Sequence, residues 1–226
     1  MSFRLFVSTA GSVAILGLFL FVPARTLNWP NAWIILGLFA VGSILSVVDL
    51  SREGPELLRE RMKPPFQRGQ PFADKVVLTI LVVGFYGMIV LAALDVFRLH
   101  LMRTPPPHIE ILGLVLFFFG WTIAWSALRE NAFAAAVVKY QEERNQVVVD
   151  TGPYRLVRHP IYAGGALLII GLPLWLGSYA ATLFAIVPIG ALIVRIAIEE
   201  RLLKRELSGY GAYMVKTRYR VIPFVW

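Results

Sequence analysis

The side chains best suited to chemistry gather in two short stretches of the C-terminal half. The first, TGPYRLVRHPIYAGG, covers residues 151–165 and stands directly before an apolar run. Pro160 fits the first turn of a helix, where its missing N–H costs little, and Gly164 one turn later permits close approach of a ligand or helix. His159 and Tyr162 would then lie beside the N–H groups of a helix start, which favour a small molecule's carboxylate. Positive-inside charge followed by a helix-packing glycine pair also explains this stretch.

The second stretch, RIAIEERLLKREL, begins at Arg195 near the end of the last apolar run. Arg195 and Glu199 are four residues apart and therefore share one helical face, with Glu200 beside them. Ionisable side chains at membrane depth are costly and usually mark a site or a water-filled cavity. Two alternatives stay open, because Arg195 would also suit snorkelling to the headgroups or a structural ion pair with Glu199.

A polar linker, QEERNQVVVDTGPYRLVRHP, spans residues 141–160 and leads into the first stretch. Its three consecutive valines favour an extended segment that offers backbone N–H and C=O groups to the edge of a planar ligand. Gly152 and Pro153 would then redirect the chain into the next helix. An ordinary ordered linker is the alternative interpretation.

The composition places these stretches in a membrane protein. Of the 226 residues 58% are hydrophobic and only 16% are charged, where soluble domains carry roughly 25% charged residues. The absence of cysteine excludes disulfides, thiolate metal ligands and a cysteine nucleophile, and three scattered histidines argue against a bound metal. The net charge of +8 comes from loops between apolar runs, so we expect positive-inside anchoring and no nucleic-acid partner.

Six apolar windows predict an all-α integral membrane protein with about six transmembrane helices. The windows cover residues 5–22, 32–50, 76–97, 109–128, 161–176 and 179–198. The fifth is the shortest, and Gly177-Ser178 separates it from the sixth, so these two should form a tight helical hairpin, either fully spanning or shallow and tilted. We divide the chain into N-terminal transmembrane helices, residues 1–128, and a functional region, residues 129–226.

Lysine and arginine are divided unequally between the two sides that these windows define. Of the 22 basic residues, 18 fall on the side of the termini and only three on the other side. The 18 lie at Arg4 and in segments 51–75, 129–160 and 199–226; the three are Arg25, Arg98 and Arg103. This asymmetry predicts that both termini and the two reactive stretches face the cytoplasm.

The loop at residues 51–75 mixes charged residues with proline and glycine. Its apolar residues Leu57, Leu58 and Met62 predict a short interfacial helix. The loop would serve either as a solvated connector or as a gate over a lipid-facing entrance.

The order of these motifs resembles the isoprenylcysteine carboxyl methyltransferase family and the related phospholipid methyltransferases. The resemblance rests on TGPYRLVRHPIYAG, a helical hairpin, RxxxEE and YGAYMVKTRYRVIP, and it covers about the last 90 residues. It implies membrane helices capped by a C-terminal cytoplasmic pocket for S-adenosylmethionine within region 129–226. By this resemblance Arg195 faces a substrate carboxylate. The cofactor site would comprise Gln141, Gln146, Val147, Val148, Val149, Tyr154, His159, Pro160, Ile161, Tyr162, Gly164, Glu199 and Glu200.

The reaction that the resemblance implies is displacement at the sulfonium methyl by the carboxylate of a lipophilic, isoprenylcysteine-like or prenylated acceptor, drawn from the surrounding membrane lipid. Glu199 would bind the cationic amino group of the cofactor, and Arg195 would orient the acceptor by bidentate hydrogen bonding. A carboxylate is already ionised near neutral pH, so this reaction needs no general base.

Three alternatives remain. Methylation of a phospholipid amine needs a proton acceptor, and a buried Arg195 would repel an ammonium head. An NADPH-dependent sterol-type membrane reductase has a similar C-terminal region, but Pro160 stands where those reductases tend to have another residue. A non-enzymatic membrane scaffold leaves three polar motifs on one face unexplained.

Overall fold

The structure is a computed structural model and describes residues 3–53, 61, 63–67 and 69–226. Within these residues every regular element is a helix, which confirms the predicted all-α class. Four segments are long and apolar enough to cross a membrane, as expected of a multi-pass integral membrane protein. They are Pro30–Asp49, Phe72–Leu99, Pro107–Glu130 and Tyr179–Glu206.

The main helices occur in the order that the apolar windows predict. They are α1 (Phe3–Ala24), α2 (Pro30–Glu53), α4 (Phe72–Leu94), α5 (Pro107–Glu130), α6 (Pro160–Trp175), α7 (Tyr179–Phe184) and α8 (Ile186–Glu206). A full crossing by the other two predicted spans stays a prediction, because α6 has only 16 residues and the side chains of α1 are described only for Thr9–Ala24. Four spans are therefore confirmed by length. The cytoplasmic orientation stays a prediction.

Among the described helices, α5 and α6 pack against each other most extensively, and glycines on both helices permit this contact. A Cβ added to Gly164 would lie 2.4 Å from the carbonyl oxygen of Gly120, and one added to Gly171 would lie 2.5 Å from that of Gly113. Lipid tails are as apolar as the side chains, so close backbone approach is a main source of helix association in a membrane. Of the two interpretations of Gly164, the structure supports helix packing.

A turn joins α6 to α7 where Gly177-Ser178 predicted one. Gly177 has φ of +87°, a left-handed conformation that glycine adopts without a Cβ clash. Ser178 caps α7 by accepting the N–H of Ala181, and its hydroxyl donates to Asp95 at 2.6 Å. The expected tight hairpin is incomplete, because α6 packs chiefly against α5 and only lightly against α8.

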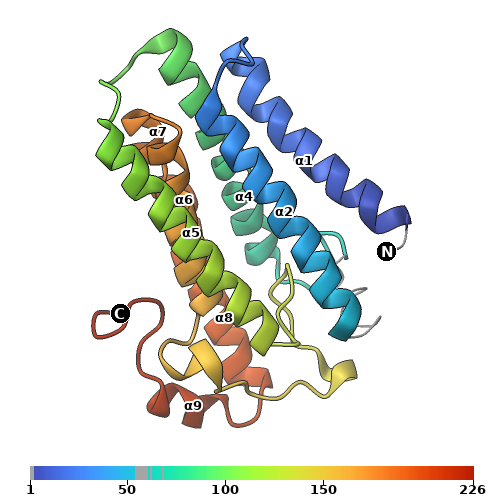
Figure 1. The fold of residues 1–226 in the computed structure, drawn as a ribbon. Helices are drawn as coiled ribbons and strands as arrows, with labels where there is room; N and C mark the ends of the chain where they lie inside the picture. The colour runs from blue at the N-terminus through green and yellow to red at the C-terminus, as the bar shows by residue number, and fades with distance from the viewer. Residues whose placement is uncertain (1–2, 54–60, 62, 68) are drawn as a thin grey trace.

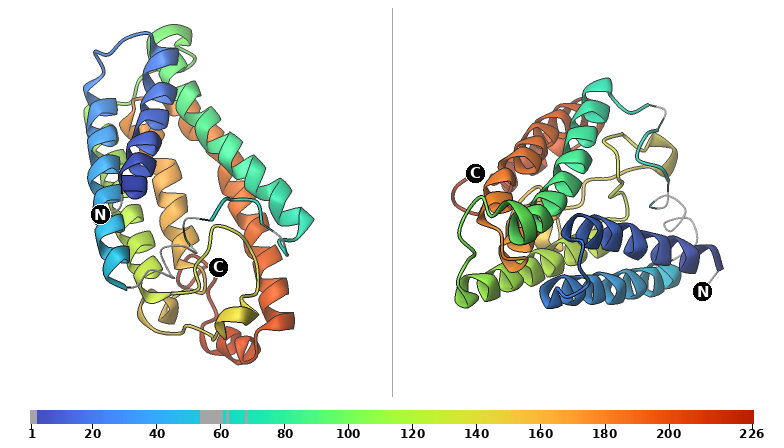
Figure 2. Two further views of the ribbon diagram at one scale, coloured as in Figure 1. Left: turned by 90° about the vertical axis from the view of Figure 1, so that its right-hand side faces the viewer. Right: turned by 90° about the horizontal axis from the view of Figure 1, so that it is seen from above.

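The helices form two groups that diverge toward one end of the molecule. Helix α8 packs along α4, while α6 packs along α5, and Figure 2 shows the two groups separating toward the C-terminal segments. The linker at residues 131–159 and the C-terminus gather at this end (Figure 1). We call it the polar end.

The segment expected to form an interfacial helix falls largely outside the described residues. Leu57, Leu58 and Met62 all lie outside the described residues, so the hypothesis of a connector or gate stays a prediction. Arg61 is described, and its guanidinium donates to the carbonyl oxygens of Leu128 and Asn131 at the end of α5.

Candidate functional site

A cavity of about 450 Å³ lies at the polar end. Its wall combines the linker after α5, the start of α6, the end of α8 and α9 (Tyr210–Lys216). Most of the residues predicted to form a site share this wall. They are Gln146, Val147, Val148, Val149, Tyr154, His159, Ile161, Tyr162, Arg195 and Glu199.

The start of α6 has the predicted geometry. Pro160 occupies the first helical turn, directly after His159. The backbone N–H of His159 donates to the carbonyl oxygen of Arg220 at 2.8 Å, so the C-terminal segment holds this corner in place. The ring of His159 stacks on Tyr162 with centroids 5.5 Å apart, and both side chains reach the cavity wall.

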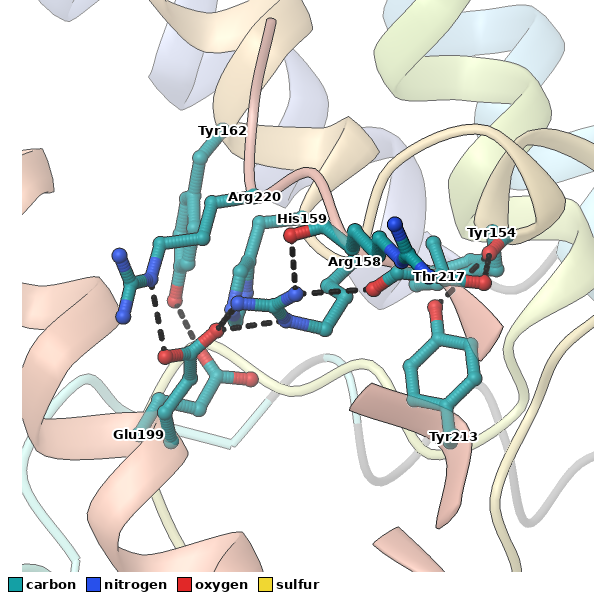
Figure 3. Close-up of polar contacts among 10 residues, drawn as sticks. Tyr154, Arg158, His159, Tyr162, Glu199, Tyr213, Thr217 and Arg220 are labelled. Atoms are coloured by element: carbon teal, nitrogen blue, oxygen red, sulfur yellow. Dashed lines mark hydrogen bonds and ion pairs between the residues drawn. The ribbon is translucent and has the colours of Figure 1, made fainter. Parts of the chain in front are cut away.

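Glu200 is surrounded by basic partners and is kept away from the cavity wall. Its Oε1 accepts from Arg158 Nε at 2.8 Å and lies 3.3 Å from His159 Nε2, while its Oε2 accepts from Arg220 Nε at 3.0 Å. Arg158 also donates to the carbonyl oxygens of the C-terminal segment, and Figure 3 shows these contacts together. Both oxygens of Glu200 are occupied, so this carboxylate ties α8 to the start of α6.

Glu199 has the opposite environment, although it is the adjacent residue. Its Oε2 accepts the hydroxyl proton of Tyr162 at 2.6 Å, and Figure 3 shows the two side chains meeting across α6 and α8. Among the ion pairs of the described residues none includes Glu199. A partly buried carboxylate on a cavity wall with no cationic partner is suited to a cationic ligand.

Arg195 is buried, but its partner is Asp74 of α4 and not Glu199. Its Nε lies 3.0 Å from Asp74 Oδ1, at ion-pair distance without the alignment of a hydrogen bond. Its Nη2 donates to the carbonyl oxygen of Ala136 at 2.5 Å. Neither an Arg195–Glu199 pair nor snorkelling to the headgroups is correct, because α4 packs along α8 and supplies a buried acid at this depth.

Buried tyrosines line the side of the cavity near α9. Tyr154 accepts a hydrogen bond from the amide of Asn131 at 3.1 Å, and the Tyr213 hydroxyl donates to the Tyr154 carbonyl oxygen at 2.8 Å. Burial raises the pKa of Tyr154, Tyr210 and Tyr213 above the usual value for a phenol. These hydroxyls are therefore protonated at neutral pH, and those of Tyr154 and Tyr210 can donate hydrogen bonds to a ligand, whereas that of Tyr213 already donates to Tyr154.

Four predicted cofactor residues are not on the cavity wall, namely Gln141, Pro160, Gly164 and Glu200. Gln141 is 1% exposed and folds the linker, donating to the carbonyl oxygen of Phe133 at 2.6 Å and accepting from Arg144 at 2.7 Å. Gly164 packs against the backbone of α5, as described above. A direct role of these four in cofactor binding stays a prediction.

The structure adds wall residues that the sequence did not indicate. The segment Ala134–Lys139 forms one rim, and Leu202, Leu203, Leu207 and Tyr210 form another. The sequence AFAAAVVK carries no polar motif, so nothing in it predicted a ligand site. Asp74 carried a weak signal, as an acid in the first turn of an apolar helix, but its partner lies 121 positions away in the chain.

Comparison with known families gives a match over part of this region. A family model described as phospholipid methyltransferase matches residues 109–209. This family is the broader one to which isoprenylcysteine carboxyl methyltransferases are related, and its members generally use S-adenosylmethionine. The matched segment runs from α5 through α8, and Asp74 lies outside it. A search of curated proteins gives no significant match.

Proposed function

We propose that the protein transfers a methyl group from S-adenosylmethionine to a lipophilic acceptor at the polar end of its membrane helices. The observation that carries this proposal is Glu199, a carboxylate on the cavity wall without a cationic partner among the described residues. The similarity of residues 109–209 to phospholipid methyltransferases supports the same class of reaction.

The residues present fit this donor molecule. S-adenosylmethionine carries an ammonium and a sulfonium, and it supplies an electrophilic methyl group when bound. Glu199 would bind the ammonium, with the Tyr162 hydroxyl holding the carboxylate in position. The wall residues Val147, Val148 and Ile161 are apolar and would exclude water from the reacting atoms.

The acceptor proposed here is a carboxylate attached to an apolar chain. Nη1 of Arg195 makes no hydrogen bond with any described residue, and the side chain reaches the cavity wall, so this nitrogen can bind an acceptor oxygen. With Nε and Nη2 already engaged, Arg195 would orient the acceptor mainly through this one nitrogen. Its task is positioning, because an ionised carboxylate needs no base to attack.

A phospholipid amine is the second candidate acceptor, and one observation favours it. Asp74 offsets the positive charge of Arg195, so this arginine no longer excludes an amine as strongly as its sequence position suggested. The ammonium group of such a lipid must lose a proton before its nitrogen can attack, and Glu199 is the carboxylate on the described cavity wall that could accept this proton.

The first test is ligand binding to the purified protein in detergent. Calorimetry should show binding of S-adenosylmethionine and S-adenosylhomocysteine but not of NADPH, and Glu199→Gln should weaken the binding of S-adenosylmethionine. Binding of NADPH alone would point to a membrane reductase and exclude the methyltransferase. Arg205→Gln is a matched control, because Arg205 is exposed on α8 and pairs only with the neighbouring Glu206 among the described ion pairs.

The second test identifies the acceptor with methyl-labelled S-adenosylmethionine. Two acceptors are offered in parallel: a carboxylic acid that carries an S-farnesyl thioether, and phosphatidylethanolamine vesicles. Alkali hydrolyses a methyl ester to volatile methanol, whereas an N-methyl group is stable to it. Alkali-labile label on the farnesylated acid supports the carboxylate acceptor, and alkali-stable label on the vesicles supports the amine instead.

A further inference from the structure

Asp74 is a buried carboxylate behind the cavity wall, to which the proposed reaction assigns no contact with donor or acceptor. It lies in the first turn of α4, is fully buried, and holds three groups from different parts of the chain. Its Oδ2 accepts from the Gln70 amide at 2.7 Å and from the Val138 backbone N–H at 3.0 Å. Its Oδ1 lies 3.0 Å from Arg195 Nε. A carboxylate without access to water is costly unless it is paired and hydrogen-bonded, and both conditions are met here.

Asp74 and Arg195 together hold the cavity rim. Arg195 Nη2 donates to the carbonyl oxygen of Ala136, while Asp74 accepts the N–H of Val138, two residues further along the same rim. The pair therefore fixes one short piece of linker between α4 and α8. It also fixes the guanidinium, whose central carbon lies 5.9 Å from the ring centroid of Tyr162, the residue that holds Glu199.

The charges on the described part of the cavity wall are unfavourable to a cation unless they are offset. The wall carries the four basic residues Arg61, Lys139, Arg158 and Arg195, and a single acid, Glu199. Carboxylates behind the wall offset such charges: Glu200 pairs with Arg158, Glu143 with Lys139, and Asp74 with Arg195. Glu143 is exposed and its charge is screened by water, whereas Asp74 is fully buried, so its charge is screened much less.

We propose that Asp74 is a positioning residue that offsets the charge of Arg195, so that the cavity accepts a donor with a positively charged sulfonium. This inference rests on the proposed function and adds a residue from outside the segment similar to phospholipid methyltransferases. Removing the Asp74 charge leaves the Arg195 guanidinium uncompensated, one helical turn from Glu199. The added repulsion acts on S-adenosylmethionine, which carries a net positive charge, and not on S-adenosylhomocysteine, whose net charge is zero.

The test compares these two ligands on Asp74→Asn, a change that keeps the side-chain shape and removes the charge. For charges on the order of 10 Å apart at an effective dielectric of about 20, the Kd of S-adenosylmethionine should rise about tenfold. The Kd of S-adenosylhomocysteine should change by less than about threefold, because a neutral ligand does not feel the added charge to first order. Adding Arg195→Gln to Asp74→Asn restores the charge balance. The ratio of the Kd of S-adenosylmethionine to that of S-adenosylhomocysteine should therefore return most of the way to its value in the unaltered protein.

Two further variants separate the electrostatic role from a structural one. Asp95→Asn is the matched control, because Asp95 is also buried but lies at the far end of α4, where it contacts Ser178. It should leave the ratio of the two dissociation constants unchanged. Asp74→Glu keeps the charge and disturbs the geometry, so it should keep the ratio of the two dissociation constants even where both affinities fall. It is the variant to measure if Asp74→Asn cannot be purified.

Two results would overturn the role of Asp74 while leaving the proposed function intact. One is an equal loss of affinity for both ligands in Asp74→Asn, and the other is a change of the ratio in Asp74→Glu as large as in Asp74→Asn. Failure of the unaltered protein to bind either ligand would instead refute the proposed function itself.

Discussion

Replacing each of the two adjacent glutamates of α8 by glutamine should give two different phenotypes. Glu200→Gln removes the charge that compensates Arg158, whose side chain is 4% exposed. Breaking a buried ion pair by removing one partner typically costs about 3–5 kcal/mol. The contact with the half-exposed Arg220 adds at most about 1 kcal/mol. Since glutamine keeps one acceptor oxygen, we expect a loss of about 3 kcal/mol in the free energy of unfolding.

Glu199→Gln should instead leave the fold nearly unchanged and weaken cofactor binding. Glu199 is partly exposed and makes one side-chain hydrogen bond, to Tyr162, so its replacement should cost less than about 1 kcal/mol of stability. Loss of a charge-assisted contact to the ammonium should cost on the order of 2 kcal/mol of binding, or about thirtyfold in the Kd of S-adenosylmethionine.

Two measurements on the same preparations separate these outcomes. Unfolding in mixed micelles with increasing dodecyl sulfate reports stability, and calorimetry in non-denaturing detergent reports the affinity for S-adenosylmethionine. The reasoning is refuted if both variants lose similar stability while affinity is unaltered. It is equally refuted if Glu200→Gln keeps full stability and Glu199→Gln unfolds.

Three other predictions follow from the packing, the arginine and the charge distribution. Gly164→Leu should lower stability by at least about 1–3 kcal/mol by forcing α5 and α6 apart, whereas Gly165→Ala, with only ordinary contact at 3.8 Å, should be tolerated; unfolding in mixed micelles checks both. Arg195→Lys should slow carboxylate methylation and leave cofactor affinity largely intact, because lysine cannot hold the Ala136 carbonyl oxygen and an acceptor in one plane. A rate of methylation equal to that of the unaltered protein would contradict this. Reporters placed after Trp226 and near Gly69 should both be cytoplasmic, and finding them on opposite faces would contradict the predicted topology.

Local features of the sequence were sufficient to predict where the helices lie along the chain. Apolar windows, Pro160 at a helix start and Gly177 at a turn depend on neighbours within a few positions, and the structure has each of them. Composition alone indicated a membrane protein, because the cost of burying charge in lipid acts on every residue of a span. Most of the predicted site residues do share one cavity wall, but it is the packing of the linker, α6 and α8 that brings them together.

The roles of the charged residues depended on contacts between distant helices. The sequence placed Glu199 and Glu200 side by side, and only the tertiary structure shows that one is enclosed by Arg158, His159 and Arg220 while the other faces the cavity. Neighbouring positions on a helix point about 100° apart, so adjacent identical residues meet different surroundings. A sequence pattern does not record what lies on either side.

Asp74 and Gly164 illustrate the same limit. The spacing of Arg195 and Glu199 suggested a local pair, but a buried cation associates with whichever acid the neighbouring helix supplies at its depth, and α4 supplies Asp74. Gly164 suited either a ligand or a helix, and only the tertiary structure shows that Gly120 of α5 approaches it closely. The sequence determined which residues form helices and which are available for chemistry, whereas the packing of one helix on another decided their partners, because contact energies depend on distances in space and not on separation along the chain.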